Sequence, residues 1–241
     1  MTAPYPAQRL VPVRRSSAGQ PLPRRPPFVI YARSMARYFD VHPSNPQPRA
    51  LTQVADLIRG GGLVAYPTDS GYALGCRLGN RDGLDRIRAI RHLSDKHHFT
   101  LVCSEFAQLG QYVQMDNDVF RAVKAATPGA YTFILQATRE APKAMLHPKK
   151  RTVGVRVPQH TTALALLHTL GEPLVSSTLI LPGHDEPMTD GWQVNDELGA
   201  QLDAVLDSGD CGLEPTTIVD LSADEPEITR YGAGDPEPFE A

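Results

Sequence analysis

Residues 61–77 read Gly-Gly-Leu-Val-Ala-Tyr-Pro-Thr-Asp-Ser-Gly-Tyr-Ala-Leu-Gly-Cys-Arg, and this stretch decides the fold. The apolar run 63–66 predicts a buried strand that ends at Pro67, because proline has no backbone N–H to continue a hydrogen-bond ladder. Polar side chains follow at 68–70, where open α/β sheets bind ligands just past the carboxyl end of a strand. The alternative is an ordinary turn, in which Thr68 and Asp69 bond to their own backbone.

The rest of the chain alternates between helical and strand-like segments. The spacing of apolar residues predicts helices near 50–58, 82–91, 106–112, 116–126, 161–170 and 196–202, with Asp82 as the cap of the second. Shorter apolar runs predict strands at 71–78, 101–103, 131–135, 152–157, 174–178, 204–206, 216–220 and 228–230, and one helical turn is expected at 142–147. This alternation predicts an α/β domain with a twisted, mixed sheet.

The composition narrows the class of protein. Of 241 residues, 41% are hydrophobic and 21% are charged, as expected of a chain with a packed core. The net charge of -3 argues against a generally basic nucleic-acid binder but allows a local basic patch. The three cysteines are scattered, which fits a reducing compartment and supports neither a disulfide framework nor a zinc site. Because no apolar run suits a membrane span or a secretory signal, we expect a cytoplasmic protein without membrane contact.

Residues 1–34 differ from everything after them, since they mix prolines and arginines without an apolar period. Such a segment buries too little surface to offset its ordering entropy, so we expect a disordered Pro/Arg-rich extension before a folded domain at 35–241. Two alternatives remain: a weak transit-like peptide, or upstream sequence translated from a misassigned start. In the last case Met35 would be the natural start, and native peptides from before Met35 would contradict it.

Familiar sequence motifs for nucleotide, hydrolase and zinc sites are absent, including the P-loop, the dinucleotide fingerprint, the Gly-x-Ser-x-Gly elbow and His-Glu-x-x-His. What remains is polar residues near strand ends. Arg156 lies inside the otherwise apolar stretch 153–158, where a buried charge needs a carboxylate or phosphate partner. The alternatives are an arginine on an edge strand that reaches water, or one paired with an aspartate of the core.

Other polar residues have two interpretations each. The hydroxyls of 176–178 end a predicted strand, where they can bind phosphate or ribose or bond back to the main chain. Arg88 and Arg91 can form an anion clamp or lie in solvent. The pair 97–98 fits loop histidines better than metal ligands, and the basic run 149–151 fits a solvated turn better than a nucleic-acid contact. The residues alone predict a polar, arginine-containing cleft for a small anion.

Four stretches together resemble the YrdC-like family, and most closely its YciO branch. They are Tyr-Pro-Thr-Asp-Ser-Gly-Tyr-Ala-Leu-Gly (66–75), Thr-Pro-Gly-Ala-Tyr-Thr-Phe-Ile-Leu (127–135), Val-Gly-Val-Arg-Val-Pro (153–158) and Pro-Thr-Thr-Ile-Val-Asp (215–220). The resemblance covers residues 38–240 in order. It implies a single α/β domain with a twisted sheet, helices on its faces and a concave ligand cleft. It also implies synthesis of L-threonylcarbamoyladenylate from threonine, bicarbonate and ATP, with release of pyrophosphate, for the t6A37 modification of tRNA.

The resemblance also implies roles for individual residues. Thr68 resembles the threonine-binding hydroxyl, Arg156 resembles the arginine that meets the substrate carboxylate, and Thr217 resembles a substrate-side hydroxyl of the late strand. On the nucleotide side, the resemblance implies Arg91, Thr132, Ser177 and Arg230. It assigns no particular residue as catalytic. It also implies no protein metal ligand, since Mg²⁺ would arrive with ATP and be held mainly by phosphate oxygens.

Two departures from the family pattern bear on activity. The Lys-x-Arg of the synthases aligns with Arg91-His92-Leu93, and their Ser-x-Asn aligns with Ser177-Thr178-Leu179. Arginine is not a neutral replacement for lysine at a phosphate site, and two lost polar contacts would weaken the orientation of ATP. The changes are consistent with the YciO branch. We therefore consider two hypotheses: a nucleotidyltransferase of the synthase type, and a catalytically weakened protein that binds nucleotide, double-stranded RNA or tRNA.

Overall fold

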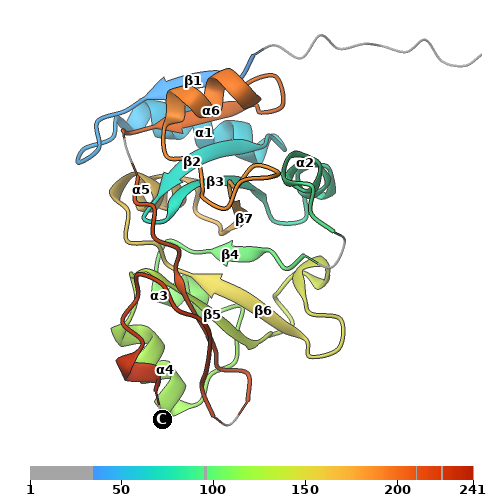
Figure 1. Ribbon diagram of the computed structural model, residues 1–241, viewed down its shortest axis with the longest axis vertical. Helices are drawn as coiled ribbons and strands as arrows, with labels where there is room; N and C mark the ends of the chain where they lie inside the picture. The colour runs from blue at the N-terminus through green and yellow to red at the C-terminus, as the bar shows by residue number, and fades with distance from the viewer. Residues whose placement is uncertain (1–34, 95–96, 210, 224, 241) are drawn as a thin grey trace, which may run out of the picture. The chain divides into compact units, whose positions relative to one another are not determined.

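The computed structural model describes residues 35–94, 97–209, 211–223 and 225–240. A ten-stranded sheet runs through these residues in the order β1-β8-β2-β3-β7-β4-β6-β5-β9-β10 (Figure 1). Parallel and antiparallel pairs are mixed: β8 pairs in parallel with β1 and β2, whereas β2, β3 and β7 pair antiparallel in succession. The predicted α/β fold with a mixed sheet is confirmed. The expected extension at 1–34 lies outside the described residues.

Nine strands lie within two residues of their predicted bounds, and β1 was not predicted. The strands are β1 (Arg37–Asp40), β2 (Val64–Thr68), β3 (Gly71–Arg77), β4 (Thr100–Val102), β5 (Tyr131–Gln136), β6 (Thr152–Arg156), β7 (Leu174–Thr178), β8 (Ala204–Asp207), β9 (Thr217–Asp220) and β10 (Glu227–Arg230). The predicted end of β2 at Pro67 is wrong, because the strand continues to Thr68. Proline is tolerated there because β2 pairs with β8 only at Val64 and Ala65, so no ladder partner needs the missing N–H.

The helices are α1 (Pro48–Arg59), α2 (Arg81–Arg91), α3 (Phe106–Leu109), α4 (Asn117–Ala125), α5 (Thr161–Leu170) and α6 (Gly191–Leu198), with 3₁₀ turns η1 (Lys143–Met145) and η2 (Glu237–Phe239). Asn80, rather than the predicted Asp82, caps α2 by accepting a hydrogen bond from the Gly83 N–H at 3.0 Å. Helix α6 begins five residues before its predicted start at 196, because the side chain of Asp190 caps it by accepting from the Gln193 N–H.

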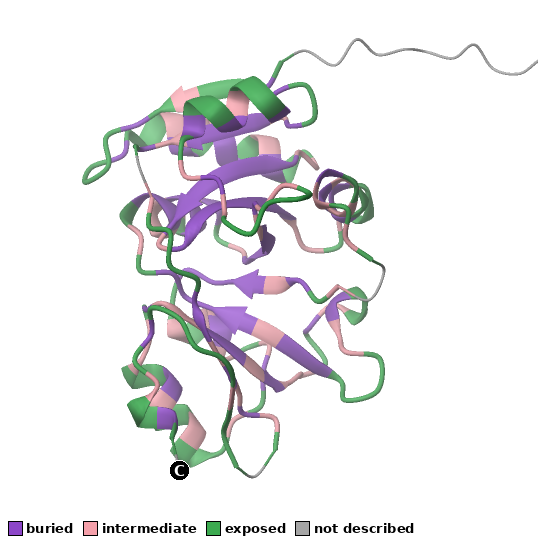
Figure 2. Ribbon diagram, in the orientation of Figure 1, coloured by how far each residue is buried: buried purple, intermediate pink, exposed green. Residues whose placement is uncertain are grey.

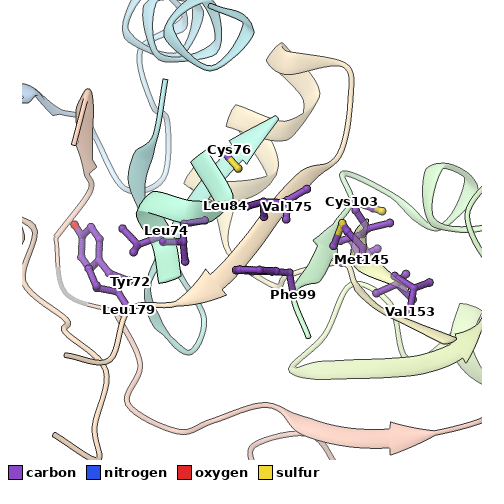
Figure 3. Packing of buried hydrophobic residues seen from close by; sticks show 14 of the residues in the cluster. Tyr72, Leu74, Cys76, Leu84, Phe99, Cys103, Met145, Val153, Val175 and Leu179 are labelled. Carbon is purple, nitrogen blue, oxygen red and sulfur yellow. The ribbon is translucent and has the colours of Figure 1, made fainter. Parts of the chain in front are cut away.

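Apolar side chains fill both faces of the sheet. Helices α1 and α5 pack with β2, β3 and β8 in one buried cluster, and α2 and α6 contribute to a larger cluster on the opposite face. Figure 3 shows part of this larger cluster, with Leu74 on β3, Val175 on β7 and Leu179 just after β7. Buried residues dominate the central strands, whereas α4 and α6 carry exposed faces (Figure 2). Within the described residues, no helix is long and apolar enough to cross a membrane.

The short strand β4 determines where the sheet opens. Its first residue, Thr100, pairs with Ser176 of β7 on one side and Gly154 of β6 on the other. Strand β7 continues past that point through Ser177 and Thr178, which pair only with β3. Polar side chains of β7 therefore have no neighbouring strand on the β4 side, and they are available to line a cavity.

Candidate functional site

A polar cavity of about 210 Å³ lies at the start of β4. It is lined by strand and loop residues that are far apart in the sequence. Six of the seven residues that the sequence predicted for ligand binding line it: Thr68, Arg91, Thr132, Arg156, Ser177 and Arg230. The structure thus brings these six together, whereas it places Thr217 elsewhere.

Arg156 is buried beside this cavity in an ion pair with an aspartate of the turn that follows β2. Its Nη2 donates to Asp69 Oδ1 at 2.5 Å, and its Nη1 donates to Ser70 Oγ at 3.1 Å. This pairing matches the alternative in which Arg156 pairs with an aspartate of the core. Nε of Arg156 and Oδ2 of Asp69 are buried without a hydrogen-bond partner among the described residues. The guanidinium accordingly has an N–H, at Nε, that no described residue accepts.

The hydroxyl of Thr68 is committed to the turn between β2 and β3. It donates to the Gly71 carbonyl at 2.7 Å and accepts the Ser70 N–H at 3.1 Å. Gly71 adopts a φ of +87°, which a residue with a side chain rarely adopts. Thr68 thus lines the cavity as part of a tight turn, which matches the alternative of an ordinary turn. Its hydroxyl hydrogen is already donated to Gly71.

Arg91, Ser177 and His97 form a chain of hydrogen bonds on another wall. Arg91 donates from Nη1 to Ser177 Oγ at 2.5 Å and from Nε to the Ile180 carbonyl at 3.3 Å. Ser177 Oγ lies 3.2 Å from His97 Nε2. Burial, followed by the positive charge of Arg91, lowers the pKa of His97 to about 4. The imidazole is therefore neutral near pH 7 and can accept the serine hydrogen. From the sequence alone, His97 is interpreted as a loop residue, because no local sequence pattern connects it to Ser177.

Arg230, Thr216 and Thr132 form a similar chain across β9 and β5. Arg230 Nη2 donates to Thr216 Oγ1 at 2.8 Å, and that hydroxyl lies 3.0 Å from Thr132 Oγ1. Burial, and second the positive charge of Arg156, lower the pKa of Arg230. The two guanidinium groups are thus close enough to repel, which an anionic ligand between them would relieve.

The prediction for Thr217 does not fit this geometry. Its side chain is fully buried, donates to the Gly234 carbonyl at 2.6 Å and accepts the Gly232 N–H at 3.0 Å. Because successive strand residues face opposite ways, Thr216 lines the cavity and Thr217 holds the C-terminal segment in place.

The two leucines at the departures from the family pattern do not line the cavity. Leu179 is fully buried in the core, where its N–H donates to the Tyr72 carbonyl at 2.8 Å (Figure 3). Leu93 packs against the same cluster. The neighbouring Ile180 lines the cavity instead. Leu93 and Leu179 therefore contribute to core packing and leave no gap in the wall.

A second cavity of about 400 Å³ adjoins the first and shares its residues His98, Thr100, Thr132 and Ile218. Its other walls combine apolar side chains, among them Phe99, Ile134 and Met145, with polar and charged ones. His98 stacks on His147 with ring centroids 5.0 Å apart, and Lys150 Nζ lies 3.7 Å from Asp220 Oδ2.

The described residues include no group of three or more His, Cys, Asp or Glu side chains that could hold a metal ion. No carboxylate side chain lines the first cavity, and Asp69 beside it is paired with Arg156. The donor groups of this cavity therefore suit anions, and a cation would need ligands from a bound molecule.

Comparisons with known proteins find relatives over most of the chain. The family model Sua5/YciO/YrdC, described as "Telomere recombination", matches residues 56–232. The chain is 45% identical to the uncharacterized protein YciO of Escherichia coli K12 over 205 residues, which cover 85% of this chain and 100% of YciO. It is 32% identical to a threonylcarbamoyl-AMP synthase of Vibrio vulnificus over 159 residues, which cover 65% of this chain and 84% of the synthase.

Solved structures show the same fold. The crystal structure of E. coli YciO superposes with a TM-score of 0.82 and covers 86% of this chain and 100% of that one. A P. abyssi Sua5 structure in complex with L-threonine superposes with a TM-score of 0.74 at 23% identity, over 81% of this chain and 57% of that one. The chain belongs to the Sua5/YciO/YrdC family.

Proposed function

We propose that this protein forms L-threonylcarbamoyl-AMP from L-threonine, bicarbonate and ATP, and releases pyrophosphate. The observation that carries this proposal is the convergence of Arg91, Arg156 and Arg230 on one polar cavity without a carboxylate in its described walls. Guanidinium groups match carboxylate and phosphate oxygens in shape as well as charge. The identity to the Vibrio synthase, and the threonine bound in the Sua5 structure, support an amino acid and a nucleotide as the ligands.

The reaction needs positioning and charge stabilisation more than a reactive side chain. The threonine amine and bicarbonate combine to a carbamate with loss of water, and a carbamate oxygen then attacks the α-phosphorus of ATP while pyrophosphate leaves. Both reactants are anions, so the arginines offset their mutual repulsion and stabilise charge that develops on phosphate oxygens. We place the carboxylate at Arg156, whose Nε is free, and the phosphates near Arg91 and Arg230.

The nucleotide requires more room than the first cavity offers. Ligand pockets are typically about 300–1,000 Å³, whereas this cavity measures about 210 Å³. The adjoining cavity supplies the difference, and its apolar residues Ile134, Met145 and Ile218 suit a nucleobase. Mg²⁺ would enter with ATP on its phosphate oxygens, since the cavity offers cations no carboxylate ligand of its own.

A second function is favoured by the segment between β5 and β6. It carries five exposed cations, of which Lys150 lines the second cavity, and one exposed acid, Glu140; the cations are Arg139, Lys143, Lys149, Lys150 and Arg151. Exposed lysines and arginines bind phosphate backbones in a salt-dependent way. We therefore retain the alternative of a protein that binds nucleotide together with tRNA or double-stranded RNA and lacks synthase activity.

A product assay separates the two functions. The protein is incubated with ATP, Mg²⁺, bicarbonate and L-threonine; pyrophosphate is quantified, and the nucleotide product is identified by mass spectrometry. The proposal predicts threonylcarbamoyl-AMP that requires threonine and is lost in Arg91→Gln and Arg230→Gln. Arg121→Gln is the control, because Arg121 is an exposed arginine of helix α4 that pairs with Asp118 and lines neither cavity. Absence of product, with ATP and RNA binding retained, would favour the alternative.

A further inference from the structure

Ser176 makes two hydrogen bonds at the wall of the first cavity, one with Tyr66 and one with the Leu74 carbonyl. Ser176 Oγ lies 3.0 Å from the Leu74 carbonyl oxygen, which can only accept, so the serine hydrogen points there. Tyr66 Oη lies 2.8 Å from the same serine oxygen. Because the serine hydrogen is already used, the tyrosine must donate. Ser176 Oγ is thereby left with one free position, and that position is an acceptor.

The direction of this pair is built into the sheet. Tyr66 lies on β2 and Ser176 on β7, with β3 between them, and Gly75 of β3 lies opposite Ser176. A Cβ at Gly75 would lie 2.8 Å from a ring carbon of Tyr66, so glycine is what allows the ring to cross β3. Tyr66 is fully buried, and burial raises the pKa of its phenol to about 12. The phenol therefore remains a donor throughout the physiological range.

The acceptor on Ser176 lies in a cavity whose charged side chains are all donors, although the hydroxyls of Thr100 and Thr178 also line it. The arginines at positions 91, 156 and 230 can only donate, and the linked hydroxyls of Thr132 and Thr216 share one hydrogen bond between them, so one of their hydrogens is left to donate. A ligand that satisfies such a cavity needs acceptor oxygens on one side and an N–H or O–H donor facing Ser176. An α-amino acid has this arrangement.

We infer that Ser176 accepts a hydrogen bond from the α-amino nitrogen of the substrate and thereby selects ligands that carry an amine. The inference rests on the proposed function, because it takes an amino acid as the ligand of this cavity. Ser176 is 3% exposed and lines the cavity, so a bound amine that it accepts from is largely removed from water. In such a setting a missing partner is costly, which gives the contact its selectivity.

The competing explanation is that Ser176 only satisfies the buried phenol of Tyr66. Two ligands and three variants distinguish the explanations. L-Threonine and 3-hydroxybutanoate share a carbon skeleton and differ in the α-amino group. Their affinities are measured by ligand-observed NMR for the wild type, Ser176→Ala, Tyr66→Phe and Ser104→Ala. Ser104 is the matched control, because it is a buried serine that lines neither cavity.

The inference predicts that Ser176→Ala weakens threonine binding by about tenfold to a hundredfold and leaves 3-hydroxybutanoate unchanged. Tyr66→Phe should change threonine affinity by less than about threefold, because Leu74 still directs the serine hydrogen. Ser104→Ala should change neither affinity. Equal effects of Ser176→Ala on both ligands, or of Ser176→Ala and Tyr66→Phe on threonine, would overturn the inference alone. A wild type that binds neither ligand would overturn the proposed function as well.

Discussion

Arg156 Nη2 lies 2.5 Å from Asp69 Oδ1, and the two side chains are only 8% and 12% exposed. This ion pair joins β6 to the turn after β2, and each partner retains one buried atom without a hydrogen-bond partner among the described residues. The pair therefore holds the turn in place. In the function that we propose, the same guanidinium group also meets the substrate carboxylate through its unpartnered Nε.

Removal of Arg156 should affect stability as well as binding. Arg156→Ala leaves the Asp69 carboxylate buried and unpaired, so we expect a loss of about 3–5 kcal/mol in the free energy of unfolding, measured by urea denaturation. The double variant Arg156→Met with Asp69→Asn removes both charges and should recover most of that stability without restoring threonine binding. An Arg156→Ala variant as stable as the wild type would contradict this account of the pair.

Neighbouring threonines on β9 should separate binding from stability. Thr217→Val leaves the Gly232 N–H and the Gly234 carbonyl without their partner, so we expect a destabilisation of about 1–3 kcal/mol with unchanged ATP affinity. Thr216→Val removes the hydroxyl that accepts from Arg230 and should weaken ATP binding more than it weakens folding. Calorimetric titration with ATP measures the affinity of both variants, and urea denaturation measures their stability. The reverse pattern would show that Thr217 faces the ligand.

Asparagine substitutions on either side of the cavity wall should behave differently. Leu179→Asn places an amide in the core, so we expect the free energy of unfolding to fall by about 2–5 kcal/mol. Ile180→Asn places the same group at the cavity and should remain folded. Thermal unfolding and product formation are measured for both. A Leu179→Asn variant that folds normally and gains activity would contradict the conclusion that Leu179 serves core packing.

Acid should destabilise the fold in part through His97. Because the pKa of this imidazole is about 4 in the folded protein and about 6.5 when unfolded, only the unfolded chain takes up the proton between those values. The contribution is complete above about pH 6.5 and is lost as the pH falls toward 4. His97→Gln should therefore reduce the fall in unfolding free energy between pH 7 and pH 5. Equal slopes in the two proteins would argue against a buried, neutral His97.

Several elements could be predicted because their signal is local. Helix α5 and strand β7 have the predicted bounds, since an apolar pattern and a turn at Gly171 mark where one ends and the other follows. Clustering of the cavity residues was also expected, because five of the six lie near the ends of strands of one sheet, and Arg91 ends helix α2. Strand β1 was missed because its Arg37–Asp40 sequence is mostly exposed, and only pairing with β8 makes it a strand.

The remaining differences depend on which way a side chain faces. A shift of one residue along a strand moves a side chain to the opposite face, so neither the Thr216/Thr217 pair nor the Leu179/Ile180 pair can be assigned from residue type. Partners distant in sequence are equally hidden: His97 reaches Ser177 across 80 positions. The turn at Thr68 looks the same in sequence whether its hydroxyl bonds to a ligand or to Gly71.

The most direct test of the central claim is threonine-dependent formation of threonylcarbamoyl-AMP, monitored by mass spectrometry of the nucleotide products. We predict that the wild type and Arg121→Gln form this adenylate and pyrophosphate in equal amounts when ATP, Mg²⁺, bicarbonate and L-threonine are present. Arg230→Gln should form little or none while remaining folded. A wild type that releases no pyrophosphate and forms no adenylate under these conditions would contradict the claim that this cavity is a synthase site.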